Sequence, residues 1–259
     1  MTATAKSGDV SAPFRHIEDL QGSLPWGSFL DAGAGTHSMG WIGTLRTTRW
    51  TAVSGAEGHA VQVRDAIDPI RRPQDRIIVG NWADGRLLDG ERYDTVLADY
   101  LLGAIEGFAP YFQEHLFARL RPHVGQRLYV VGLEPYVTSF PDNDAGRLVS
   151  AIGRYRDSCL LLAGERPYRE YPQHWAAANL IASGYRLLDQ RRFPIRYGQR
   201  FVDSQIDMSL MRLGKLENHP LAQALRDEGE RLRQRGHDHI AAHGHIPCGW
   251  DYVIAAEPA

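Results

Sequence analysis

The sequence predicts an α/β fold in which a mostly parallel sheet is covered by helices on both faces. The main observation is that short apolar stretches alternate with helical ones along most of the chain. A second is a glycine-rich segment directly after the first apolar stretch. A third is size, because 259 residues with 43% hydrophobic content suit one large domain or a domain with insertions.

The first elements are expected close to the N-terminus. Residues 1–27 form an N-terminal segment, in which Pro13–Gln21 suits a short helix because proline is favoured in a first turn. Ser28–Gly35 is predicted as a buried strand running into a tight turn, and His37–Leu45 as the helix that follows. The next strands are expected at Trp50–Ala56, Arg76–Val79, Tyr93–Ala98 and Gln126–Leu133, with a helix over Tyr111–Leu120.

Two long excursions then interrupt the alternation. Residues 135–174 contain an amphipathic stretch at Ala145–Ala163, and a segment this long with its own helix predicts a cap. The body resumes with a helix over Trp175–Ser183 and a strand at Tyr185–Gln190. The second excursion, about 196–246, contains the polar helix His219–Arg235, and Trp250–Ala255 closes the chain as the last strand.

Charge and composition exclude several classes of protein. The chain has 29 basic and 31 acidic residues, so it lacks the basic surplus of a protein that binds mainly phosphate backbone. Of the basic residues only Lys6 and Lys215 are lysines, a bias that indicates a genome rich in G and C. We therefore expect no nucleic-acid partner.

Apolar runs and cysteines in the chain predict its compartment. No apolar run approaches the ~18 residues of a membrane helix, and the first residues lack the apolar centre of a secretory signal. Cys159 and Cys248 are the only cysteines, too few for a disulfide framework. A cytoplasmic protein without a membrane partner is expected.

Strand-end motifs carry a family resemblance. The segment FLDAGAG (29–35) resembles the first motif of class I S-adenosylmethionine-dependent methyltransferases, which is an apolar strand, an acid and Gly-x-Gly. Four further segments resemble later motifs of that family in the same order, namely 53–60, 76–84, 93–102 and 119–135. The resemblance implies a doubly wound, Rossmann-like sheet of seven strands with an antiparallel last strand, spanning 28–259. It also implies S-adenosylmethionine as cofactor and S-adenosylhomocysteine as product.

A nicotinamide-binding site is the main rival. Its fingerprint is Gly-x-Gly-x-x-Gly, and here Ser38 stands at the third glycine. Asp31 is also unfavourable beside a pyrophosphate but favourable beside a sulfonium. An oxidoreductase and a non-catalytic protein of the methyltransferase fold stay as alternatives.

The resemblance assigns cofactor contacts to the strand ends. Glu57 is expected at the ribose, since a carboxylate can accept two hydrogen bonds from a diol, although Ser54 could occupy that strand end instead. The side chains Asn81 and Trp82 are expected at the adenine. At His37, a contact with the cofactor's carboxylate and a helix cap are both open. The full cofactor set is Asp31, Gly33, Gly35, His37, Glu57, Asn81 and Trp82.

Acceptor chemistry is expected after the fourth strand. Asp99 and Tyr100 should lie near the transferred methyl group, with a helix-capping role as the alternative for Asp99. Glu134 is a further catalytic candidate, and Glu170 with His174 could replace Asp99. The cap supplies Tyr136, Tyr171 and His174 as substrate contacts, because aromatic walls suit a small planar molecule.

The predicted function is methylation of a small aromatic or heteroaromatic metabolite in specialised metabolism. A homodimer is compatible with the sequence. No metal is expected, although His239 and His243 have the spacing of two ligands on one helix face. The histidine-rich cluster that leaves this point open consists of His237, His239, His243, His245 and Cys248.

Overall fold

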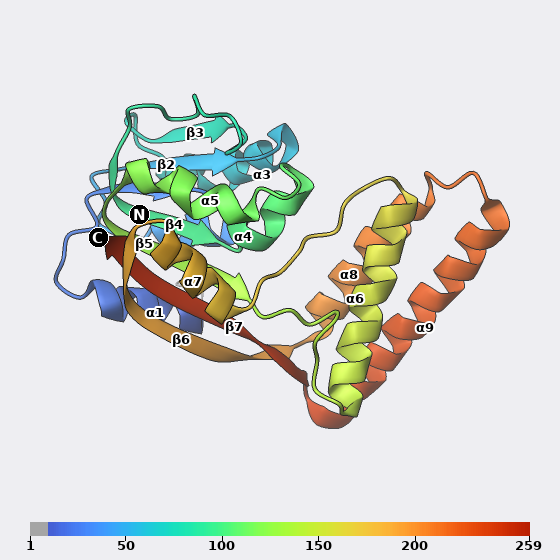
Figure 1. Cartoon of the computed structure of the whole chain (residues 1–259). Helices are drawn as coiled ribbons and strands as arrows, with labels where there is room; N and C mark the ends of the chain where they lie inside the picture. The colour runs from blue at the N-terminus through green and yellow to red at the C-terminus, as the bar shows by residue number, and fades with distance from the viewer. Residues whose placement is uncertain (1–9) are drawn as a thin grey trace, which may run out of the picture.

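The computed structural model describes residues 10–259 and centres on a seven-stranded sheet (Figure 1). Its strands are β1 Ser28–Asp31, β2 Arg49–Ser54, β3 Arg76–Val79, β4 Tyr93–Asp99, β5 Val124–Leu133, β6 Tyr185–Tyr197 and β7 Ile246–Pro258. They lie in the order β3-β2-β1-β4-β5-β7-β6, and β7 runs antiparallel to both of its neighbours. The predicted sheet is confirmed. The first nine residues of the predicted N-terminal segment lie outside the described residues.

Helices cover both faces of the sheet because its central strands are buried on both sides. Alternate residues of β4 enter different cores: Val96 and Ala98 face one layer, whereas Leu97 faces the other. One layer contains α4 Leu101–Ala104, α5 Gln113–Leu120 and α7 Gln173–Ala182. The opposite layer contains α1 Ala12–Gln21, α2 Thr36–Ile42 and α3 Glu57–Ile67. Short 3-10 turns occupy Asp68–Ile70, Ile105–Gly107 and Arg121–His123.

The remaining helices form a separate helical unit beside the sheet (Figure 1). It consists of α6 Asp144–Leu162, α8 Gln199–Leu213 and α9 His219–His243, which share one hydrophobic core. The sequence predicted α6 and α9 in two separate excursions, and the structure packs them together. None of the described helices is long and apolar enough to cross a membrane.

Close packing within this unit depends on glycines of α9. A Cβ atom at Gly236 would lie 2.7 Å from a methyl carbon of Val202 in α8, and one at Gly229 would collide with the Tyr155 hydroxyl of α6. Since Val202 is fully buried, it has little room to move away. Glycine therefore lets α9 approach its two neighbours.

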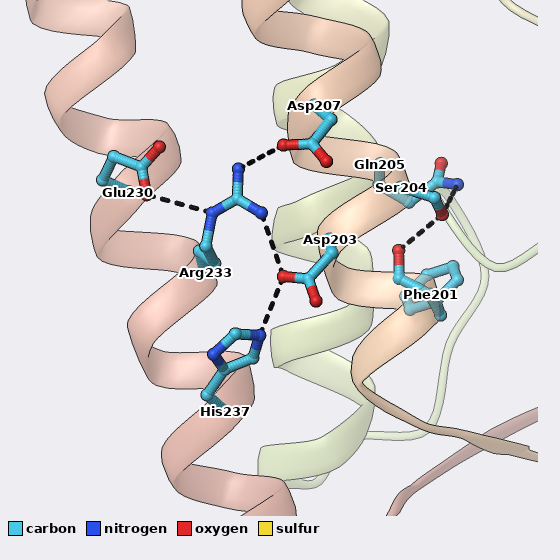
Figure 2. A network of polar contacts seen from close by, with 8 residues as sticks. All are labelled: Phe201, Asp203, Ser204, Gln205, Asp207, Glu230, Arg233 and His237. Carbon is cyan, nitrogen blue, oxygen red and sulfur yellow. Dashed lines mark hydrogen bonds and ion pairs between the residues drawn. The ribbon is translucent and has the colours of Figure 1, made fainter.

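Polar contacts join α8 to α9 along an outer edge (Figure 2). The Arg233 guanidinium donates to Asp203 at 2.9 Å, to Asp207 at 2.6 Å and to Glu230 at 3.0 Å. The Nε2 atom of His237 lies 2.8 Å from the same Asp203 carboxylate. His237, from the histidine-rich cluster, thus has a structural partner. Within residues 10–259, no group of three or more His, Cys, Asp or Glu side chains is positioned to hold a metal ion.

Strands β6 and β7 connect the helical unit to the sheet and are longer than the predicted Tyr185–Gln190 and Trp250–Ala255. Their outer halves pair only with each other, as far as Tyr197 opposite Ile246. In the outer half of β6, Phe193, Ile195 and Tyr197 alternate with polar positions, but the charged pair Arg191 and Arg192 separates this alternation from the predicted strand.

Candidate active site

A pocket lies at the carboxyl ends of β1 to β4, where ligands bind in open α/β sheets. Its empty volume, including the open mouth, is about 680 Å³. The strand ends and the turns after them line it, with residues Ala32, Gly33, Ala34, Val53, Ser54, Gly55, His59, Gly80, Asn81, Trp82, Asp99, Leu101, Ala104, Ile105, Phe108 and Tyr168. Four of the predicted site residues therefore come together here: Gly33, Asn81, Trp82 and Asp99.

Glycines keep the pocket walls close to the backbone. A Cβ atom at Gly55 would lie 2.8 Å from the Phe108 ring, and one at Gly80 would lie 2.6 Å from Leu87. Both distances are too short for ordinary carbon contacts. Glycine at these strand ends thus allows neighbouring side chains to pack directly on the main chain.

Buried hydrogen bonds of Asp31 and Ser38, which do not line the pocket, hold the turn after β1 in place. The fully buried Asp31 carboxylate accepts hydrogen bonds from Ser38 Oγ at 2.7 Å and from the Gly33 amide at 3.2 Å. Ser38 Oγ in turn accepts from the Gly35 amide at 3.1 Å. Burial raises the pKa of Asp31 to about 6, against the opposing effect of these two donors. Asp31 and Gly35 shape the turn and do not line the pocket.

The two ribose candidates occupy different places. Ser54 ends β2, is 3% exposed and lines the pocket. Glu57 begins α3, is exposed and is not among the lining residues. The end of β2 thus presents the Ser54 hydroxyl to the pocket, whereas the Glu57 carboxylate expected at the ribose lies outside the lining.

The Asn81 and Trp82 side chains also support the pocket walls. Asn81 donates to the Phe108 carbonyl at 2.7 Å and accepts from the Ala83 amide at 2.9 Å. The Trp82 indole is 3% exposed and donates to the Ala32 carbonyl at 2.7 Å. Each joins the turn after β3 to another wall of the pocket.

His37 lies at the rim of the glycine turn and outside the pocket. It is the second residue of α2, whose N-cap is Gly35, and its ring stacks on Phe14 at 4.9 Å. Burial lowers the pKa of His37, and the positive charge of Arg200 in α8 lowers it further. A positively charged Arg200 therefore lies near a His37 ring that burial favours in its neutral form.

Asp99 and Tyr100 point in different directions from the end of β4. Asp99 lines the pocket, and its Oδ1 atom is buried without a hydrogen-bond partner. Burial raises the pKa of Asp99 well above its usual range, and the negative charges of Asp31 and Asp251 add to the shift. Tyr100, not Asp99, is the N-cap residue of α4. The Tyr100 hydroxyl donates to Asp251, while burial raises the pKa of the phenol.

The other predicted substrate and catalytic residues do not line the pocket. Glu134 pairs with Arg192 at 2.8 Å and accepts from the Gln173 amide, which ties β5 to β6 and α7. Tyr136 is in the core of the helical unit, with its hydroxyl 2.5 Å from Arg156. Tyr171 packs on Trp175 with ring centroids 4.2 Å apart, and His174 is exposed on α7.

Three further residues reach the sheet edge, and the sequence had named one of them, Glu170, as an alternative to Asp99. Tyr168 and Glu170 belong to the segment 163–172, which returns from α6 and is fixed where the Arg169 amide donates to Gly103 at 3.2 Å. Tyr168 lines the pocket, and the Glu170 carboxylate occupies the space that a Cβ atom at Gly103 would need. Asp251, in β7, is an acid directly before the apolar run Tyr252–Ala256, which was the available signal for it.

Comparison with solved structures gives the fold its place among known proteins. A proposed methyltransferase from Bacillus halodurans C-125 is 13% identical with a TM-score of 0.59, over 96% of this chain and 99% of that one. A S-adenosylmethionine-dependent methyltransferase from Geobacter sulfurreducens, solved with S-adenosylhomocysteine, is 13% identical with a TM-score of 0.53, over 99% and 95%. The fold is that of a class I methyltransferase.

This methyltransferase fold also occurs in a protein named for other chemistry. The cyclase SpnF is 12% identical with a TM-score of 0.56, over 95% of this chain and 79% of that one. A scan of protein-family models and a search of curated sequences find no match. The fold alone therefore does not identify a reaction, and a function has to be argued from the residues that line the pocket.

Proposed function

We propose that the chain binds S-adenosylmethionine in the pocket at the ends of β1 to β4 and methylates a small molecule. The observation that carries this is the position of the pocket together with the buried, unpartnered Asp99 oxygen that faces it. A carboxylate without a partner suits a ligand that brings positive charge. When bound, the cofactor supplies a methyl group on a positively charged sulfur.

The lining residues fit the parts of that cofactor. The main chain at Gly33 and Gly55 offers close approach, and Ser54 offers a hydroxyl where the ribose is expected. Asn81 and Trp82 hold the adenine side in shape through their bonds to neighbouring backbone. Arg200, which lies near His37 at the rim, supplies the positive charge that suits the cofactor's carboxylate. The chain would then orient the two reactants and exclude water.

The acceptor would lie between the sheet edge and the helical unit. The aromatic side chains that line the pocket are Trp82, Phe108 and, on the return segment, Tyr168. Such walls suit a small, partly planar molecule. A structural neighbour is described in connection with echinomycin biosynthesis, which supports a role in specialised metabolism.

A second candidate is a protein of this fold that does not transfer a methyl group. Ser54 at the end of β2, in place of an acid, favours it, as does the likeness to the cyclase SpnF. Both candidates need the pocket occupied, so ligand binding is tested first and methyl transfer second.

Calorimetry with S-adenosylhomocysteine and with NAD tests the proposal. We expect one binding site for S-adenosylhomocysteine and no heat with NAD. Gly55→Val should weaken binding at least tenfold, equal to about 1.4 kcal/mol, because the new side chain displaces Phe108 into the pocket. The control is Gly58→Val, three residues on, where a Cβ atom meets nothing within 4 Å.

Each outcome has a defined meaning. Binding of NAD alone would replace the methyltransferase assignment with an oxidoreductase. Absence of S-adenosylhomocysteine binding to the folded wild-type protein would refute the assignment. If Gly55→Val and Gly58→Val weaken S-adenosylhomocysteine binding equally, the cofactor does not bind beside Gly55.

A further inference from the structure

The return segment (163–172) runs along the outside of the pocket wall that α4 and the 3-10 turn after it form. The Arg169 amide donates to the Gly103 carbonyl at 3.2 Å. A Cβ atom at Gly107 would lie 3.3 Å from one ring carbon of Tyr168. Because glycine carries no side chain, the Tyr168 ring rests directly on the main chain of the turn.

Tyr168 lies at the mouth of the pocket, since it lines the pocket and is still 48% exposed. Gly107, on which its ring rests, directly precedes Phe108, whose carbonyl accepts a hydrogen bond from Asn81 at 2.7 Å. Asn81 marks the end of the pocket where the adenine is expected. A half-exposed aromatic ring at this end can pack against a flat ring in the pocket.

An ion pair with a buried acid holds the return segment in place. The Arg166 guanidinium lies 3.2 Å from the carboxylate of Glu106, which is 4% exposed. Gln113 and the Tyr111 amide donate to the same carboxylate at 2.8 Å and 3.2 Å. Burial opposes ionisation of Glu106, but these donors and the charge of Arg169 outweigh it and lower its pKa. Arg166 therefore has a fixed, ionised partner on the pocket wall.

The return segment is also bound to the helical unit. Glu165 accepts from Arg212 of α8 at 3.1 Å and from Lys215, just after that helix, at 2.6 Å. Tyr168 is thus preceded by two anchored residues and followed by Arg169, whose amide is bonded to the wall. A side chain held in this way loses little conformational freedom when a ligand binds beside it.

We propose that Tyr168 covers the adenine ring of the bound cofactor, and that Arg166 positions Tyr168 by holding the return segment to Glu106. This rests on the proposed function and deepens it, because it adds a cofactor contact from outside the strand ends. Trp82 is fixed on the inner side of the pocket by its bond to the Ala32 carbonyl. Tyr168 then supplies the outer side by stacking, which aromatic rings offer to any base.

Calorimetry with S-adenosylhomocysteine tests both residues. Tyr168→Ala should weaken binding about tenfold, within the range that stacking of a base on an aromatic ring contributes. Tyr168→Phe keeps the ring and should bind within about twofold of wild type. Arg166→Gln should weaken binding about fivefold, and Arg166→Lys should recover part of this loss because lysine keeps the positive charge.

The chain offers a matched control for each variant. The Phe140 ring also lies under an arginine of the helical unit and does not line the pocket, so Phe140→Ala should leave binding unchanged. Arg147 pairs with Asp142 and Asp144 at the start of α6, so Arg147→Gln should also leave it unchanged.

Fluorescence of a Tyr168→Trp variant gives a readout that a merely structural role would not move. Adenine stacked on an indole quenches its emission, so saturating S-adenosylhomocysteine should quench this variant more than it quenches wild-type protein. Adding Arg166→Gln to the same variant should reduce the extra quenching at saturating ligand, because the new indole is no longer held in position.

The proposal is overturned if folded Tyr168→Ala binds S-adenosylhomocysteine as tightly as wild type, or if Tyr168→Phe loses as much affinity as Tyr168→Ala. An equal loss in Phe140→Ala would also overturn it. If Tyr168→Ala does not fold, absence of extra quenching in Tyr168→Trp overturns the stacking contact. Unchanged binding in Arg166→Gln overturns the positioning role.

The proposal and the proposed function fail in different ways. Wild-type protein that binds S-adenosylhomocysteine, together with any of these contrary results, leaves the proposed function standing. Folded wild-type protein that does not bind S-adenosylhomocysteine refutes the proposed function itself.

Discussion

Side chains at the strand ends divide into those that face the pocket and those that hold its walls. Ser54 and Asp99 offer polar atoms to the pocket, whereas Asp31 and Ser38 hold the turn after β1 from behind. Motif positions predicted Gly33, Asn81, Trp82 and Asp99 at the pocket, because motif residues follow strand ends directly. Sequence could not separate a ligand contact from a wall support, since this depends on where each side chain points.

Asp251 was not expected at the sheet edge, and Glu170 was expected there only as an alternative to Asp99. Asp251 reaches the sheet edge only because β7 is antiparallel and longer than its apolar pattern. Glu170 lies in an irregular segment without any periodicity that would orient it.

At Asp251 the raised pKa predicts a pH-dependent contribution to stability. Between about pH 4 and 6 the unfolded chain has lost this proton while the folded chain still holds it. The wild-type protein should therefore lose stability relative to Asp251→Asn as pH rises through this window, by up to about 3 kcal/mol, and the difference should level off above it. Asparagine keeps an acceptor for the Tyr100 hydroxyl, so the variant removes mainly the charge.

Urea unfolding of both proteins at several pH values measures this difference. Asp142→Asn, at an exposed site, serves as the reference and should show no such trend. A difference between wild type and Asp251→Asn that is constant from pH 4 to 7 would show that Asp251 titrates normally in the folded protein.

Elements of the sheet were predictable because each central strand carries its own apolar signal. The extensions of β6 and β7 were not, because Arg191 and Arg192 interrupt β6 and because Gly249 separates the buried Ile246 and Cys248 from the apolar run of β7. The joint packing of α6, α8 and α9 was also hidden. The contacts among these helices link segments far apart in sequence. The glycines of α9 that permit close packing lower helix propensity, so they give no sign of an interface in the sequence.

For α9 we predict that Gly236→Ala destabilises the protein by about 1–3 kcal/mol. The added methyl group meets the buried Val202 side chain at 2.7 Å, so one helix must shift. The control is Gly40→Ala in α2, where nothing lies within 4 Å and alanine should stabilise by about 0.5–1 kcal/mol. Urea unfolding followed by circular dichroism compares the two. The same sign in both variants would contradict the close packing of α8 and α9.

On the scale of the whole molecule, the carboxyl ends of the parallel strands point towards the helical unit (Figure 1). The pocket lies at the carboxyl ends of β1 to β4, and strands β6 and β7 lead from the sheet to the helical unit. Under the proposed function, this arrangement would allow a cofactor in the pocket and an acceptor beside it to be positioned for reaction. The alternation of strands and helices predicted the sheet. That the two excursions pack into one helical unit is seen only in the structure.

A crystal structure of the protein with S-adenosylhomocysteine tests the central claim most directly. The account predicts the adenosyl group between Gly33, Gly55 and Asn81, the ribose within hydrogen-bond distance of Ser54, and the sulfur facing Asp99 towards Glu170. It would be contradicted by ligand bound on the opposite face between α1 and α2, or by a pocket that stays empty at saturating ligand. A ribose held by Glu57 instead of Ser54 would keep the cofactor assignment and correct the residue that carries it.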